Sequence, residues 1–246
     1  MSSYYLAFDV GGTTIKYALI DEQLQITQRA HIDTEHNHNG AIIQKLLLIT
    51  QKLQAQYSLL GIGVSTAGIV DQDGAIKYAG PTIPNYQGTP IKHSLEAQSG
   101  LPVSVVNDVD AALLGEMLAG AAQTATNAYC VALGTGIGGA LTINGRLYSG
   151  AHENANSIGY TSYHPTTDTN YEQRAATLAL ERTLSTYHIS VKDAFEQAKA
   201  GVAPYPKLLE QWSDTVAAGI ANILLLLDPE VLVLGGAVAL QGDYLV

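Results

Sequence analysis

Residues 6–16 read LAFDVGGTTIK, and this stretch determines the structure expected at the start of the chain. The β-rich runs Tyr4–Val10 and Thr14–Ile20 flank it, and only Gly11-Gly12-Thr13 separates them. Two such runs joined by a short Gly-containing loop predict a β-hairpin. The two glycines would let a polyanion approach the backbone closely, and successive N–H groups in such a turn form an anion-binding concavity.

The side chains around this turn suit a polyphosphate. The hydroxyls of Thr13 and Thr14 can hydrogen-bond phosphate oxygens, and Lys16 lies two residues beyond them. Asp9 is placed to hold Mg²⁺ through water. An ordinary hairpin turn explains the same residues, and the motif alone leaves both interpretations open.

A second unit of the same kind lies about one domain length further on. Tyr129–Leu133 and Ala140–Ile143 are expected strands, and GTGIGG, Gly134–Gly139, lies between them. Its first residues, Gly134, Thr135 and Gly136, are placed to flank a transferring phosphoryl group. No Lys-Ser/Thr pair follows and no helix opens there, which excludes a P-loop and argues against a dinucleotide fingerprint. The repeated pattern predicts two related lobes, residues 1–115 and 116–246.

Asn107-Asp108 ends the expected strand Leu101–Val106, just before an Ala/Leu-rich helix at Asp110–Ala122. A carboxylate in that place can take the proton of an attacking hydroxyl. A helix N-cap explains both residues equally well, because Asn and Asp favour that position.

The last part of the chain reads as a long helix, Tyr205–Leu227, which Asp228-Pro229 ends. The strand Val231–Leu234 then runs into Gly235-Gly236. Glycines at the end of a strand can pack against a flat adenine and its ribose, although a tight turn would also require them.

Composition narrows the class of protein. Hydrophobic residues make up 47% of the chain and charged residues 14%, which is typical of buried sheets rather than disorder. The formal net charge of -10 disfavours nucleic acid as a partner. Cys130 is the single cysteine, so Cys-clustered zinc sites and disulfide frameworks within the chain are excluded. With no signal peptide and no apolar run long enough for a bilayer, a soluble cytoplasmic protein without a membrane partner is expected.

Taken together, the motifs resemble the ROK family (repressors, open reading frames and kinases), and the resemblance runs from about Tyr4 to Ala239. The matching blocks come in the family's order. They are the first phosphate motif at Asp9–Thr13, a second block at Gly63–Asp71, the catalytic stretch Asn107–Glu116, the second phosphate motif at Gly134–Gly139 and the adenosine-side motif Leu234-Gly235-Gly236.

The resemblance implies an α/β fold of the actin-like ATPase type, with two ribonuclease H-like lobes and a cleft between them. It implies a kinase that uses Mg-ATP to phosphorylate a sugar hydroxyl, often at C6. Asp108 would be the general base, Asn107 a sugar ligand, and Gly68 and Asn85 would lie near the sugar. Dimers are common in the family, so the resemblance allows a homodimer without fixing the oligomeric state. Asp9 comes too early in the chain for a DNA-binding module.

Three features depart from the family pattern. The family usually has Glu-x-Gly-His where this chain has Ser157-Ile158-Gly159-Tyr160. The tyrosine resembles a minority branch that includes β-glucoside kinases and fructokinase-like members. The serine offers one neutral group where a carboxylate would accept strong bonds from two sugar hydroxyls, so altered sugar selection is expected.

The other two departures concern zinc and the end of the chain. No cysteine follows His152 or His164, so the family's structural zinc is not expected. The family's strand and helix after the Leu-Gly-Gly motif, which return to the first lobe, have no counterpart, so we expect apolar surface on the first lobe. A catalytically impaired sugar-binding or regulatory protein on the same fold is therefore the alternative to the kinase.

Overall fold

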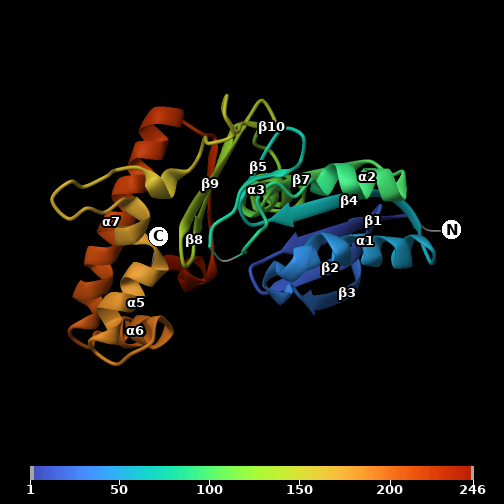
Figure 1. The fold of residues 1–246 in the computed structure, drawn as a ribbon. Helices are drawn as coiled ribbons and strands as arrows, with labels where there is room; N and C mark the ends of the chain where they lie inside the picture. The colour runs from blue at the N-terminus through green and yellow to red at the C-terminus, as the bar shows by residue number, and fades with distance from the viewer. Residues whose placement is uncertain (1–2, 82, 245–246) are drawn as a thin grey trace. The chain divides into compact units, whose positions relative to one another are not determined.

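The computed structural model describes residues 3–81 and 83–244, and the chain divides into two compact units, Met1–Ala111 and Ala112–Val246. The division falls within one helix, α3 (Asp108–Ala119), four residues before the boundary expected from the sequence. Each unit contains a β-sheet with helices packed on it (Figure 1).

The first unit is built on a five-stranded mixed sheet with the strand order β3-β2-β1-β4-β7. β1 pairs antiparallel with β2 and parallel with β4, and β4 pairs parallel with β7. The five strands are β1 (Ser3–Val10), β2 (Thr14–Asp21), β3 (Ile26–Asp33), β4 (Ser58–Thr66) and β7 (Val103–Asn107). Because β1, β4 and β7 run in the same direction, their carboxyl ends, Val10, Thr66 and Asn107, lie at one edge of the sheet.

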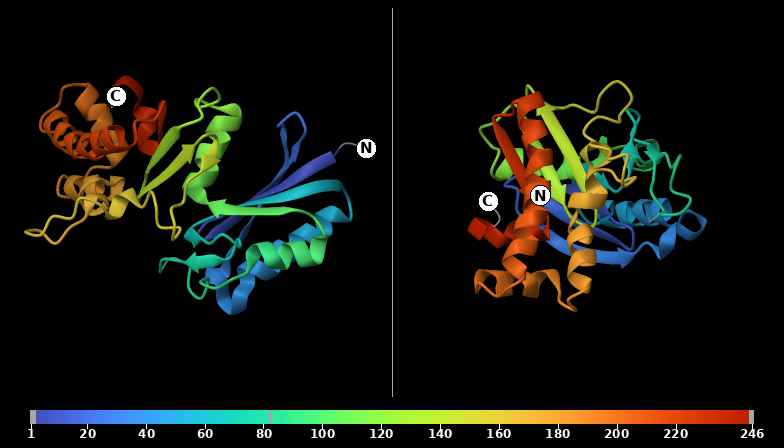
Figure 2. Two further views of the ribbon diagram at one scale, coloured as in Figure 1. Left: turned by 90° about the horizontal axis from the view of Figure 1, so that it is seen from above. Right: turned by 90° about the vertical axis from the view of Figure 1, so that its left-hand side faces the viewer.

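Two helices, α1 (Ala41–Gln54) and α2 (Ile91–Ser99), lie side by side on the sheet (Figure 2). Alternate residues of β1, Leu6, Phe8 and Val10, point into the core that these helices cover. The remaining elements are short and lie in the connections between these strands and helices. They are the 3-10 segment η1 (Glu35–Gly40) and the strands β5 (Ile69–Val70) and β6 (Ile76–Tyr78).

Residues of β1, β2 and β3 line an open hollow of about 600 Å³ on the sheet. It is lined by apolar side chains such as Ala18, Ile20 and Ile26, together with Asp9 and Lys16.

The second unit has a four-stranded sheet with the order β10-β9-β8-β11. Its strands are β8 (Ala128–Leu133), β9 (Ile137–Ile143), β10 (Arg146–Leu147) and β11 (Val231–Gly235), and a 3-10 turn, η2 (Ile158–Tyr160), follows β10. Its helical elements are α4 (Tyr171–Ala175), α5 (Thr177–Ser185), α6 (Val191–Lys199), α7 (Tyr205–Leu227) and the 3-10 segment η3 (Ala237–Tyr244). Within the described residues, no helix is both long and apolar enough to cross a membrane.

The predicted hairpins are confirmed. Thr14 is the first residue of β2, and the Gly11 N–H donates to the Thr14 carbonyl over 3.0 Å. In the second unit Leu133 pairs with Ile137 across the Gly-rich turn. The helix α7 has the predicted bounds, while α3 (Asp108–Ala119) begins two residues earlier and ends three residues earlier than expected.

Candidate functional site

The first Gly-rich turn places Asp9 at the carboxyl edge of the first sheet. Asp9 is paired with Lys16 across the hairpin, and the Lys16 Nζ lies 3.3 Å from its Oδ2. The Ser65 hydroxyl, at the end of β4, donates to Asp9 Oδ1 over 3.2 Å. The carboxylate is half exposed, so it is oriented by protein donors and still open to a ligand.

The turn itself is held by Thr34, the residue that follows β3. The Thr34 Oγ1 donates to the Gly12 carbonyl over 2.8 Å, and the Thr34 N–H donates to the Thr13 carbonyl over 2.9 Å. In a planar trans peptide the C=O and N–H groups point in opposite directions. The Thr13 N–H is therefore aimed away from Thr34, which makes it a candidate phosphate donor.

Asn107 and Asp108 lie at the junction of β7 and α3. The Asn107 Nδ2 donates to the Gly68 carbonyl over 2.8 Å, and its Oδ1 accepts the Val109 N–H over 2.9 Å. Asn107 therefore makes the N-cap bond considered from the sequence and also holds Gly68, which has φ +100°. Gly68 has no room for a side chain, because a Cβ there would lie 2.5 Å from the Tyr78 carbonyl oxygen.

The Asp108 carboxyl is electrostatically placed to accept a proton. Burial raises its pKa above 3.8, and the nearby negative charge of Asp9 raises it further, while the Val109 N–H partly offsets both effects. A base whose proton affinity is shifted toward neutral pH is better suited to proton abstraction. The charge of Asp9 thus acts on Asp108 within the first unit.

The loop that contains Asn85 is anchored through the next residue, Tyr86. The Asn85 side chain is exposed and its backbone is left-handed, with φ +56°. Its neighbour Tyr86 is fully buried, with its hydroxyl 2.9 Å from the Thr66 hydroxyl, and burial raises the pKa of Tyr86 to about 12. Asn85 is therefore presented by a fixed loop.

In the second unit, the Gly134–Gly139 turn is fixed by its own backbone and by one carboxylate. The Gly134 N–H donates to the Gly136 carbonyl over 2.9 Å, and the Ile137 N–H donates to the Glu172 Oε2 over 2.7 Å. Because these two N–H groups are already bonded, the candidate phosphate donors of this turn are those of Thr135 and Gly136.

The segment Ser157–Tyr160 lies beside the same turn. The Ser157 hydroxyl donates to the Asn154 carbonyl over 3.0 Å, and Tyr160 is 68% exposed. A Cβ at Gly159 would lie 2.5 Å from the Ile137 carbonyl oxygen, so η2 can approach the hairpin only with glycine there. A Cβ at Gly159 would also lie 3.1 Å from the Glu172 Oε2, so the carboxylate that bonds the turn lies close to this segment as well.

Gly235 is the last residue of β11, and the chain turns at Gly236 directly after it. Gly236 has φ +102°, and a Cβ there would clash with the Leu133 carbonyl oxygen. The turn alternative considered from the sequence is therefore present, and an adenosine role for Gly235 and Gly236 stays a prediction.

The histidines considered for zinc lie in loops. The His164 Nδ1 lies 3.0 Å from the Thr167 hydroxyl. Across residues 3–81 and 83–244, no three His, Cys, Asp or Glu side chains are grouped to hold a metal ion. The absence of structural zinc remains a prediction.

Sequence reasoning missed several residues of these sites. Thr34, Ser65 and Glu172 act through contacts between segments 22 to 56 residues apart, and no local pattern indicates such contacts. Glu172 gave one weak signal, because it lies in the first turn of a helix that begins with an Asn170–Gln173 capping box.

The family model described as "ROK family" matches residues 5–246. The chain belongs to the ROK family. An uncharacterised protein of Clostridium perfringens is 37% identical over 95% of this ROK chain and 81% of its own length. A glucokinase of Halalkalibacterium halodurans is 30% identical over 98% of this chain and 82% of its own length.

Solved structures agree with this membership. The structure of a ROK-family glucokinase from Streptomyces griseus in complex with glucose and AMPPNP has a TM-score of 0.77 and 27% identity to this chain. It is matched over 98% of this chain and 86% of its own length. This ROK protein therefore has the two-lobed, actin-like ATPase fold that the motifs predicted.

Proposed function

We propose that this protein transfers the γ-phosphoryl group of ATP to a hydroxyl of a hexose or hexose derivative, at C6, with Asp108 as the general base. The observation that carries the proposal is the Asp108 carboxyl, which has a raised pKa beside Asp9 and follows Asn107 at the carboxyl edge of the sheet. The class of enzyme, an ATP-dependent carbohydrate kinase, follows from family membership and from similarity to glucokinases.

In the proposed reaction, Asn107, Gly68 and Asn85 bind the sugar and orient one hydroxyl toward Asp108. Asp108 takes the hydroxyl proton as the oxygen attacks the γ-phosphorus of ATP, the bond from that phosphorus to the bridging oxygen breaks, and ADP leaves. Most of the catalytic gain in such a reaction comes from positioning and from stabilising the transferred charge. The oriented N–H groups of the two Gly-rich turns supply that stabilisation in this proposal.

The residues of the first unit fit a magnesium ion. Asp9 offers a half-exposed carboxylate with hard oxygen donors, and Mg²⁺ is usually held by one or two carboxylates with waters and substrate phosphates. Asp9 would hold the ion through water, and the ion would neutralise charge on the phosphates of ATP. Lys16 would add a positive charge to the same side.

The second unit would contribute Thr135 and Gly136 as phosphate donors, Ser157 and Tyr160 as sugar contacts, and the Gly235-Gly236 turn beside adenosine. One observation favours the alternative of an impaired sugar-binding protein. The Ser157 hydroxyl, where the family has a carboxylate, already donates to Asn154.

A coupled assay of ADP release over glucose, fructose, N-acetylmannosamine and a phenolic β-glucoside tests the proposal. We expect sugar-dependent ADP release with at least one member of the panel and a loss of at least 100-fold in kcat for Asp108→Asn, in line with the usual contribution of a general base, about 10²–10⁴-fold. Sugar binding by calorimetry without sugar-dependent ADP release would support the binding protein instead. Activity that persists in Asp108→Asn would overturn the role of Asp108.

A further inference from the structure

The segment between β3 and α1 adopts a backbone that its sequence does not favour. Glu35, His36 and Asn37 follow one another with φ values of +51°, +48° and +54°. Only glycine adopts this left-handed region freely, although Asn tolerates it. Non-glycine residues held there cost conformational free energy and persist only where surrounding contacts fix them, often at functional sites.

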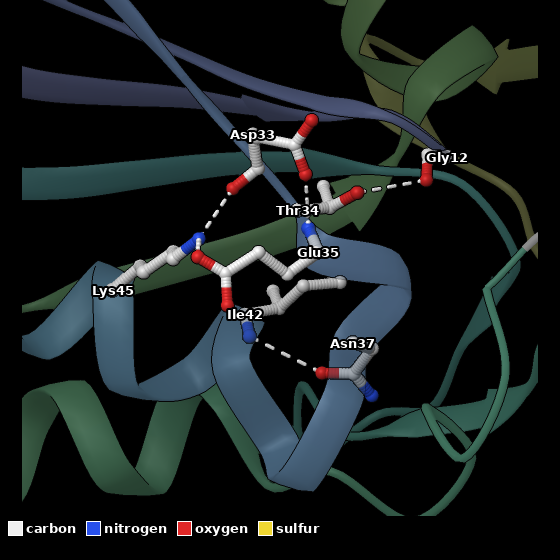
Figure 3. Close-up of polar contacts among 7 residues, drawn as sticks. All are labelled: Gly12, Asp33, Thr34, Glu35, Asn37, Ile42 and Lys45. Carbon is white, nitrogen blue, oxygen red and sulfur yellow. Dashed lines mark hydrogen bonds and ion pairs between the residues drawn. The ribbon is translucent and has the colours of Figure 1, made fainter.

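The contacts that fix this segment begin at Thr34, which is fully buried. Its hydroxyl and its N–H bond the carbonyls of Gly12 and Thr13, as Figure 3 shows for Gly12. Both groups belong to the turn that is proposed to bind phosphate. Loss of the hydroxyl would free the Gly12–Thr13 peptide to rotate, and the Thr13 N–H would rotate with it.

Asn37 makes the corresponding contacts on the other side of the segment, and only 1% of it is exposed. Its Nδ2 donates to the carbonyls of Pro84 and Asn85, each over 3.1 Å. Its Oδ1 accepts the Ile42 N–H over 3.2 Å, which joins it to the start of α1 (Figure 3). A buried amide with both ends bonded has one geometry, so it fixes the loop that presents Asn85.

We propose that residues 34–37 are a positioning element, in which Thr34 sets the phosphate-side turn and Asn37 sets the sugar-side loop. Neither residue touches a substrate in this assignment; each acts through the backbone it holds. The inference rests on the proposed function of Gly12, Thr13 and Asn85. Because Thr34 holds only the phosphate-side turn and Asn37 only the sugar-side loop, mutation of each residue should affect the binding of one substrate.

An exposed residue between β3 and α1 provides a matched control. Lys45 Nζ bonds Glu35 Oε1 and the Asp33 carbonyl, each over 2.6 Å, and Figure 3 shows this pair away from Gly12. Asn39 has a left-handed φ of +52°, like Asn37, but it is exposed. Asn39→Asp therefore repeats the substitution Asn37→Asp on a similar backbone without the buried donor.

The test compares Thr34→Val, Thr34→Ser, Asn37→Asp and Asn39→Asp in the full chain, with ATP and the best sugar of the panel above. Valine keeps the shape of threonine and removes the hydroxyl, while serine keeps the hydroxyl. Loss of one or two such bonds is expected to change a binding constant about 3- to 10-fold. We expect Thr34→Val to raise KM for ATP by that factor with KM for sugar within twofold of wild type, and Asn37→Asp to do the reverse. Thr34→Ser and Asn39→Asp should match wild type.

A general loss of folding would lower the apparent kcat and the melting temperature without changing either KM value selectively, so the split in KM separates positioning from stability. Equal changes in both KM values, or no change in either, would overturn the inference. Hydrogen exchange distinguishes a failure of this inference from a failure of the proposed function, because the exchange measurement does not depend on catalytic turnover. Faster exchange at residues 85–89 in Asn37→Asp and at residues 11–14 in Thr34→Val supports the inference even if ADP release is absent, and unchanged exchange at both loops overturns it.

Discussion

Asp110, two residues after the proposed base, is a partly buried carboxyl with a raised pKa. Burial and the charge of Asp108 raise its pKa from 3.8 to about 6. A carboxyl whose pKa is raised by folding costs stability where it is ionised in both states. That cost is fully present above about pH 6, declines as the pH falls, and is absent below 3.8.

Asp110→Asn should therefore stabilise the protein at pH 7.5 and have little effect at pH 4. We expect a gain in the free energy of unfolding of about 1–2 kcal/mol at pH 7.5, below the full equivalent of the shift because the side chain is partly exposed. Urea unfolding followed by circular dichroism at pH 7.5, 5 and 4 measures it, with the exposed Asp73→Asn as control. The same gain at all three pH values would contradict the explanation.

Single residues show where sequence reasoning works and where it stops. Asn107 and Asp108 could be found because a polar pair at the end of an apolar strand is a local pattern. The two roles considered for Asn107, N-cap and site residue, are compatible, since its two side-chain atoms hold Val109 and Gly68 separately. Thr34 and Glu172 could not be found, because their partners lie 22 and 35 residues away.

At the scale of elements, Glu172 joins α4 to the β8–β9 hairpin. Its carboxylate accepts the Ile137 N–H, and a Cβ at Gly136 would lie 2.5 Å from the same Oε2. If the acceptor is removed, that partly buried N–H is left without its partner. An unsatisfied donor of this kind costs about 1–3 kcal/mol.

Glu172→Ala should lower the free energy of unfolding of the second unit by about 1–3 kcal/mol and raise KM for ATP, because the turn loses its fixed shape. Glu172→Gln keeps an oxygen acceptor, so its free energy of unfolding should fall less and its KM for ATP should rise less. Urea unfolding and steady-state kinetics measure the two effects, with the exposed Glu181→Ala as control. Equal losses in the alanine and glutamine variants would argue against the hydrogen bond as the cause.

The regular elements themselves were largely predictable. Both hairpins, β7, α7 and β11 follow from apolar runs bounded by Gly, Asn-Asp or Asp-Pro. The left-handed turn at Glu35–Asn37 was not predictable from local preference, since contacts with Gly12 and Asn85 override it. Tertiary contacts decide the backbone where local propensity is weak.

At the scale of the whole molecule, the two units have separate cores. One buried cluster includes Leu46 of α1 and the other Leu184 of α5, and the two clusters share no residue. Proteins of more than one domain often depart from two-state unfolding, because each core can be lost separately. The chain also contains its own reporter, since Trp212 is the single tryptophan and is 6% exposed in the second core.

These features predict that core mutations act on one unit at a time. Leu184→Ala should cost about 2–5 kcal/mol and move the urea midpoint seen by Trp212 fluorescence. Leu46→Ala should cost a similar amount and move only the part of the circular dichroism transition that belongs to the first unit, because Trp212 donates its Nε1 hydrogen bond to Ala175 within the second unit. If Leu46→Ala shifted the fluorescence midpoint as far as Leu184→Ala does, the two cores would unfold as one. The stability effects predicted for Asp110 and Glu172 would then have to appear both in Trp212 fluorescence and in circular dichroism.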